Sequence, residues 1–245
     1  MAYFYNLVFY QPLLNTLVFL YESIAFQDFG IAVILITVLI RVVLYPLFAR
    51  SVRHQAVMQR LQPKLKKVQE DLKHDREKQV AAMMNLYREH RINPFSGFGL
   101  LIAQLPVLIA LYHIFLNATK PDFLDGLYSF VPHPESISAS FLGLVDLGVS
   151  NVFIVGFAAI AQYFQGLTAL PRLEPGREPS QAEKVGRRMV LIGPVITFLI
   201  FYNLPAAVGL YWTVTSAVTI LQQRIINRGL DNEQRTVGTT RSGTG

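Results

Sequence analysis

The 245-residue chain contains no cysteine, which excludes disulfide bonds, thiolate metal sites, cysteine nucleophiles and lipid attachment at a cysteine. Charged residues are also scarce: they make up 16% of the chain, whereas soluble domains carry roughly 25%. Hydrophobic residues make up 52%. This balance favours a membrane protein over a soluble one.

Recognisable catalytic motifs are missing as well. The chain has no HExxH, no GxSxG and no phosphate-binding glycine-rich loop. Its long apolar runs contain no acidic residue, so little in them could abstract a proton. Of the five histidines, His113 alone falls near a predicted membrane face. We therefore expect neither enzyme activity nor a cofactor or metal ion.

Five apolar runs are long enough, or nearly so, to cross a bilayer as helices. They cover about residues 30–48, 97–116, 152–170, 189–203 and 206–223. The last two runs are separated by three residues, which predicts a tight helical hairpin. The sequence thus predicts an all-α polytopic membrane protein with five transmembrane helices.

The basic residues between these runs set the expected orientation, because cytoplasmic loops are rich in Lys and Arg. Segments 50–92 and 171–188 and the C-terminal tail are basic, whereas 117–150 has one lysine against four acids. We expect the basic segments in the cytoplasm and the N-terminus outside. The formal charge of +6 is then explained by membrane topology, and no DNA partner is expected.

The two ends of the chain differ from the core, which we place at residues 30–228. Residues 3–26 are a sixth candidate span, but polar residues recur along them, which favours an amphipathic helix at the outer membrane interface over a true span, within an extracytoplasmic segment 1–29. No Lys or Arg precedes Arg41, so a signal-peptide n-region is missing and this segment is expected to be retained. The polar, Gly- and Thr-rich residues 229–245 are expected to form a disordered cytoplasmic tail.

Apolar residues recur at helical spacing on both sides of an uninterrupted polar stretch, 73–76, within the basic segment 50–92. This predicts a cytoplasmic hairpin of two helices, with a kink or break at Pro63. The hairpin either joins two spans as a solvated connector or docks a cytoplasmic partner or the membrane surface. The candidate docking residues are Met58, Pro63, Lys64, Met83, Met84 and Tyr87.

Arg41 is the one charge inside the first apolar run. A guanidinium stays protonated at ordinary pH, and burying one at the centre of a membrane helix costs roughly 2.5–3.5 kcal/mol on insertion scales. Because the other runs offer no acid, Arg41 either lines a polar cavity or extends to an interface. Uncharged polar and aromatic residues in the spans could line such a cavity with it, although each alone is more often structural: Thr37, Gln104, Gln162, Tyr211 and Trp212.

Several local strings resemble the YidC/Oxa/Alb family of membrane protein insertases. They occur in the family's order and spacing over about residues 10–228: Asp28-Phe-Gly…Ile40-Arg41…Tyr45-Pro46, Leu61-Gln62-Pro63-Lys64, Met83-Met84…Tyr87, Asn93-Pro94…Gln104-Leu-Pro106, and Leu204-Pro205…Tyr211-Trp212…Gln222-Gln223. The resemblance implies five helices around a hydrophilic groove that is open to the cytoplasm and to lipid, with Arg41 providing its charge. The chain would be a minimal five-span version.

The resemblance also implies a function without covalent chemistry. The protein would insert membrane proteins and help them fold, without ATP, in the bacterial plasma (inner) membrane. Its partners would be nascent or newly made membrane proteins and the lipid bilayer, with the Sec translocon and the ribosome as candidates at the hairpin. Two alternatives are a membrane-embedded assembly chaperone or scaffold without insertion activity and, less favoured, a small-anion transporter that uses Arg41 as its site.

Overall fold

The structure, a computed structural model, describes residues 2–90, 96–118, 120–170, 179 and 181–242. The expected Asn93-Pro94 motif and most of the connecting segment between residues 170 and 181 lie outside this part of the chain. The elements, in chain order, are α1 (Ala2–Tyr5), π-helix η1 (Asn6–Tyr10), α2 (Gln11–Ser23), α3 (Phe29–Val43), α4 (Tyr45–Asp71), α5 (Arg76–Glu89), α6 (Ser96–Asn117), 3₁₀-helix η2 (Pro121–Leu124), β1 (Ser140–Phe141), β2 (Val145–Asp146), α7 (Val152–Ala169), α8 (Gln181–Phe201) and α9 (Ala206–Ser242).

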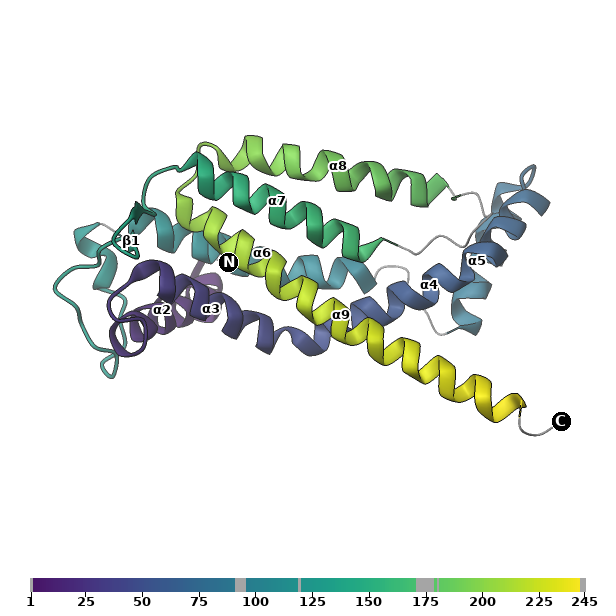
Figure 1. Cartoon of the computed structure of the whole chain (residues 1–245), viewed down its shortest axis with the longest axis horizontal. Coiled ribbons are helices and arrows are strands. Elements are labelled where there is room, and N and C mark those ends of the chain that lie inside the picture. Colours follow the sequence, from purple (N-terminus) through teal and green to yellow (C-terminus); the bar gives the residue numbers. More distant parts are fainter. Residues whose placement is uncertain (1, 91–95, 119, 171–178, 180, 243–245) are drawn as a thin grey trace.

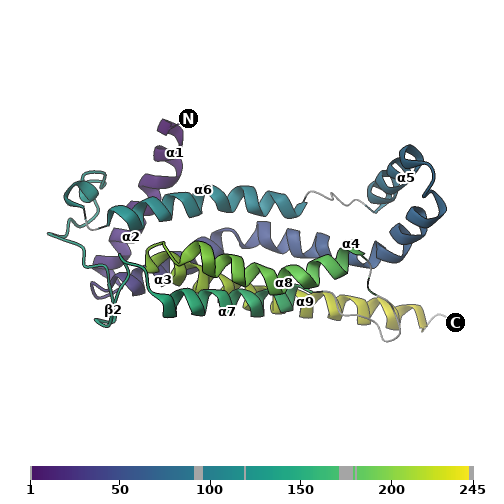
Figure 2. The ribbon, with the colours of Figure 1, turned by 90° about the horizontal axis from the view of Figure 1, so that it is seen from above.

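The long helices α6, α7, α8 and α9 extend along the long axis of the molecule (Figures 1 and 2). One end of this axis carries α2, the start of α3 and the antiparallel pair β1–β2. The opposite end carries α4, α5 and the C-terminal part of α9. The fold is therefore mostly helical, as expected, and the described residues 120–150 lie at the opposite end from the hairpin of α4 and α5 (Figure 1).

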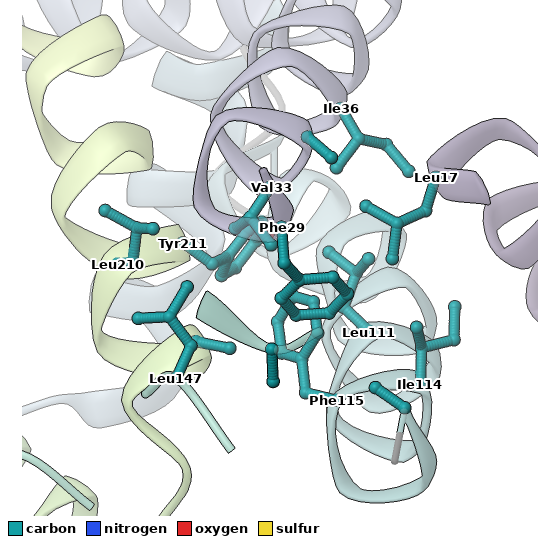
Figure 3. Close-up of a cluster of buried hydrophobic side chains, with 14 of the residues drawn as sticks. Leu17, Phe29, Val33, Ile36, Leu111, Ile114, Phe115, Leu147, Leu210 and Tyr211 are labelled. Carbon is teal, nitrogen blue, oxygen red and sulfur yellow. The ribbon is translucent and has the colours of Figure 1, made fainter. Parts of the chain in front are cut away.

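The main core lies between α2, α3, α6 and α9 (Figure 3). Leu17 of α2, Ile36 of α3 and Leu111 of α6 are fully buried there. Tyr211 of α9 is the largest fully buried side chain of the described residues, at 1% exposed. The N-terminal segment thus contributes to the core.

Helix α2 differs from the expected interfacial helix, because its apolar face is covered by protein. Its polar residue Asn15 is 3% exposed. The Asn15 side-chain amide donates to the carbonyl of Gly126 at 3.2 Å, and its carbonyl accepts from the N–H of Tyr128 at 2.6 Å. A polar side chain that indicated a surface position therefore holds a loop onto the core.

The first apolar run is divided between two helices. Helix α3 ends at Val43, and α4 begins at Tyr45 with a bend of 60° between them. Pro46 near the start of α4 explains this break, since proline suits the first turn of a helix and interrupts a helix that already extends through it. Pro63 does not break the helix, since α4 continues through it to Asp71.

Helix α7 packs against both α8 and α9, whereas α8 and α9 contact each other only weakly. The connection 202–205 is as short as expected. The two helices that it joins, α8 and α9, pack mainly against α7 and only weakly against each other, so they do not form the expected tight hairpin. Glycines allow this close packing. A Cβ at Gly166 would lie 3.0 Å from Val190, and a Cβ at Gly209 would lie 3.0 Å from Ile154.

Within the described residues, one helix, α7, is long and apolar enough to cross a membrane by itself. The bent pair α3 and α4 meets the same criterion when taken together, and residues 102–117 of α6 are apolar but shorter. Only Val155 and Ala158 of α7 are buried, so most of its apolar surface faces outward. Five helices occupy the expected ranges, and among the described residues length and composition alone identify one of them, or two with the bent pair, as spans.

The C-terminal segment is helical as far as Ser242, which differs from the expected disordered tail from residue 229 onward. The first turn of this segment packs against protein: Leu230 contacts a small cluster of Phe48, Val52 and Ile226. Helix α9 therefore continues beyond the main core along the start of α4.

Candidate functional site

Arg41 lies in the last turn of α3 and is 4% exposed. Its Nη2 donates to the Gln222 side-chain carbonyl at 2.8 Å, and the Gln222 amide donates back to the Arg41 backbone carbonyl at 3.1 Å. The guanidinium carbon lies 4.8 Å from the centre of the Phe48 ring, a cation–π distance. No carboxylate pairs with Arg41 in the described part of the chain. The charge is thus enclosed and held by an uncharged amide and an aromatic ring.

Helix α9 brings the other expected polar residues together. The Gln104 amide on α6 donates to the Tyr211 hydroxyl, and the Trp212 indole N–H donates to the Gln162 carbonyl on α7 at 3.0 Å. With Arg41 and Gln222, these pairs link α3, α6 and α7 to the same helix. Four of the expected lining residues therefore form two pairs, one to each side of α9.

Thr37 is also next to this region but is fully buried. Its hydroxyl donates to the Val33 carbonyl one turn earlier, at 2.5 Å. This is the common structural role of threonine in an apolar helix. Thr37 therefore contributes to packing of α3 rather than offering a free polar group.

Several polar atoms around α9 are buried without a hydrogen-bond partner among the described residues. They are Nε of Arg41, Oε1 of Gln104 and Oγ of Ser216. Buried polar atoms are almost always paired with protein or with water, and an unpaired one costs about 1–3 kcal/mol. These atoms therefore indicate a region suited to water or to polar groups of a bound chain.

Gln222 was not among the expected site residues. It lies eleven residues after Tyr211, which is three helical turns, and Thr215 and Thr219 fall on the same side in between. This polar stripe at spacings of four, four and three could have identified it. Phe48 could not be found in this way, since its position over Arg41 results from the bend between α3 and α4.

The hairpin formed by α4 and α5 has its own small core. Leu61 and Leu65 are buried, and Met58, Met83 and Tyr87 pack against them. These three candidate docking residues therefore hold the two helices together, and burial raises the pKa of the Tyr87 hydroxyl. Pro63, Lys64 and Met84 are exposed, so their docking role stays a prediction.

Asp75 caps α5 in this hairpin. Its carboxylate accepts the backbone N–H of Lys78 at 3.0 Å and lies 2.9 Å from the Lys78 ammonium. These contacts lower the pKa of Asp75, the backbone hydrogen bond most and the ammonium next. Because the folded pKa is depressed, the cap stabilises α5 above the unfolded value of about 3.9. The stabilisation is lost as the pH falls through the lower folded value.

We expect hydrogen exchange at the first turn of α5 to accelerate in acid for this reason. Asp75→Asn is the matched variant, because asparagine caps a helix nearly as well and does not titrate. Exchange measured by mass spectrometry, corrected for intrinsic rates, should show the acid-dependent opening in the wild type and not in Asp75→Asn. The same acid response in both proteins would contradict the assignment.

Comparisons with known proteins cover most of the chain. Residues 19–234 match the family described as "60Kd inner membrane protein". A membrane protein insertase YidC from Geobacter sulfurreducens is 33% identical over 91% of this chain, and one from Francisella philomiragia is 31% identical over 82%. The chain covers 38% and 33% of those proteins. A crystal structure of an active YidC insertase with its first transmembrane domain resolved has a similar fold, with a TM-score of 0.58 at 23% identity, over 89% of this chain and 45% of that one.

Proposed function

The chain belongs to the YidC/Oxa1 family of insertases, the 60Kd inner membrane proteins, and from this we propose that it inserts membrane proteins into the bilayer and helps them fold, without ATP. The chain spans less than half the length of the curated relatives it matches, so the activity is proposed for this core by itself. The observation that carries the proposal is the enclosed, acid-free environment of Arg41. A positive charge held in low dielectric by a neutral amide keeps its attraction for an incoming carboxylate.

We propose that five helices, α3 with the start of α4, α6, α7, α8 and α9, cross the membrane around a hydrophilic groove. The groove opens to the cytoplasm and to lipid. From the Asp28 cap to Arg41, α3 rises by about 20 Å, which is two thirds of a hydrocarbon core of about 30 Å. With the N-terminus outside and the C-terminus in the cytoplasm, as we propose, Arg41 would lie nearer the cytoplasmic side of the membrane.

The positions of the connecting segments support this orientation. The basic hairpin α4–α5 and the C-terminal part of α9 lie at one end of the molecule, and the acidic segment 117–150 lies at the other. Cytoplasmic loops carry the excess of Lys and Arg. The exposed side chains of Lys64 and Met84 on the hairpin are then on the membrane side where a ribosome or a Sec translocon would dock.

The geometry suggests how the chain lowers the barrier to insertion. Moving an acidic segment across hydrocarbon is expensive because its carboxylates lose their water. Buried polar atoms on Arg41, Gln104 and Ser216 would stabilise water and polar backbone part of the way across. The apolar segment of the substrate can then leave sideways along the outward-facing apolar surface of α7 and partition into lipid, which drives the reaction.

Reconstitution tests this proposal. The purified chain is placed in liposomes, and a small single-span protein with an acidic N-terminal tail is added, with protease protection of that tail as the readout. Empty liposomes are the control, and a substrate with amides in place of the tail carboxylates tests the electrostatic part. We expect protection above the empty control, larger for the acidic tail. No protection by chain that is folded in the liposomes would contradict insertion.

A further inference from the structure

Two loop tips at the end of the molecule opposite the hairpin expose large apolar side chains. Phe26, between α2 and α3, is 92% exposed. Leu142 and Leu144, at the turn between β1 and β2, are 59% and 83% exposed. Neither segment 24–27 nor segment 140–145 contains a charged residue. We call Phe26, Leu142 and Leu144 the apolar rim.

The backbone at these tips makes the choice of residue unusual. Phe26 and Leu142 both have φ values of 54°, and Gln27 and Gly143 follow at 57° and 68°. Positive φ strains residues with large side chains and favours Gly, Asn or Asp. Successive positive φ values in a tight hairpin turn favour Asn-Gly most of all. The choice of Leu at position 142 and of Phe at position 26 is explained neither by the backbone conformation nor by burial in the protein.

Hydrogen bonds fix the rim at the level where helices begin. Asp28 caps α3, accepting the Ile31 N–H at 2.8 Å, and its other carboxylate oxygen accepts the N–H of Leu142. Just after β2, the Leu147 carbonyl accepts the Ala207 N–H at 3.1 Å near the start of α9. The tips are thus tied to the starts of α3 and α9.

The same level is the start of α7, the helix long enough to cross a membrane by itself. The Val149 carbonyl accepts the Ala206 N–H at 2.8 Å, and α7 begins three residues later at Val152. In the transmembrane arrangement proposed above, the start of α7 and the tips therefore reach the membrane surface at the same level. At this level of the bilayer, the lipid headgroups meet the acyl chains.

We propose that the apolar rim is a lipid-binding surface that inserts into the outer-leaflet interface and fixes how deeply the core sits in the bilayer. Uncharged apolar side chains at this boundary penetrate by about 5–10 Å, and strain at exposed tips is typical of positions kept for a function. The proposal rests on the transmembrane arrangement proposed above, not on insertion activity. It gives the outer end of the molecule a role separate from the groove.

Because the chain has no cysteine, single cysteines can report depth directly. Leu144→Cys and Phe26→Cys probe the rim, Glu135→Cys is an exposed control in the same outer segment, and Ile160→Cys probes the outward face of α7. Each is labelled with the fluorophore NBD and reconstituted in phosphatidylcholine–phosphatidylglycerol liposomes. Quenching by lipids with a shallow spin label is compared with quenching by aqueous iodide.

We expect labels at 144 and 26 to be quenched by the shallow lipid probe and protected from iodide, while the label at 135 shows the reverse. Leu142→Asn provides a second test, because asparagine suits a positive φ and should leave the melting temperature in detergent unchanged or raised. In liposomes the same change should increase iodide quenching of the label at 144. An unchanged depth in Leu142→Asn would overturn the role of Leu142.

The label at 160 separates the two proposals. If it is deeply buried while the rim labels are as accessible to iodide as the label at 135, the rim does not bind lipid and the transmembrane arrangement still holds. If the label at 160 is itself accessible to iodide, the arrangement fails and the rim fails with it. Protease-protection assays on the same liposomes report insertion activity independently of either result.

Discussion

Replacing Gly30 with alanine is expected to destabilise the fold by about 1–3 kcal/mol, the usual cost of overpacking a filled core. Gly30 is in the first turn of α3 and is buried against the Phe141 ring of β1. A methyl group there would overlap the ring and would lie 2.7 Å from Phe141 Cβ. Since Cβ is the root of the side chain, rotation of the ring cannot remove the overlap and the hairpin must move.

Gly156→Ala is the matched control, because a Cβ at this position of α7 meets no atom within 4 Å. It should be neutral, or stabilising by up to about 1 kcal/mol through helix propensity. The loss of monodisperse protein with temperature in detergent measures both variants. In the double variant Gly30→Ala/Phe141→Gly, which removes both the ring and Cβ of residue 141, the alanine at 30 should cost nothing beyond Phe141→Gly alone. Additive effects of the two changes would contradict a clash at this contact.

The fold was predictable where a helix is a continuous apolar run, and less so where chain segments meet. The ranges of α6 and α7 follow from their apolar runs, and the hairpin α4–α5 follows from local periodicity. Helix α8 begins at Gln181, eight residues before the expected run, inside the segment expected to be a loop. The bend after Val43 was not predicted, because the apolar run continues past it and Pro46 lies in the first turn of a new helix rather than inside a continuous one. The packing of α2 on the core depends on Asn15 finding partners at Gly126 and Tyr128, which are far away in sequence.

The candidate site shows the same division. Arg41 stands out in the sequence because it is a single charge in an apolar run, and a residue of this kind needs a partner or a cavity. Sequence alone listed Gln104, Gln162, Tyr211 and Trp212 without pairing them, because pairing depends on which helices adjoin. The structure shows that α9 is shared by both pairs and that Gln222 holds Arg41.

Arg41→Ala is expected to reduce insertion of a substrate with an acidic tail by about tenfold or more, since a hydrogen bond to a charged group contributes about 1.5–3 kcal/mol. Arg41→Lys should recover much of the activity, because the charge is kept although the contact with Gln222 is changed. The rate at which protease-protected substrate appears in liposomes measures the effect. Arg50→Ala is the matched control, an exposed arginine of α4 beyond the bend, and should leave the rate unchanged.

The substrate with amides in its tail separates attraction from hydration. If Arg41 acts by attracting carboxylates, Arg41→Ala should slow the acidic substrate and hardly affect the neutral one. Gln222→Ala should have an intermediate effect on the acidic substrate, because it removes the amide that orients the guanidinium and leaves the charge. Equal slowing of both substrates by Arg41→Ala, in protein that remains folded, would show that Arg41 maintains a hydrated groove, and would contradict a role in attracting acidic tails.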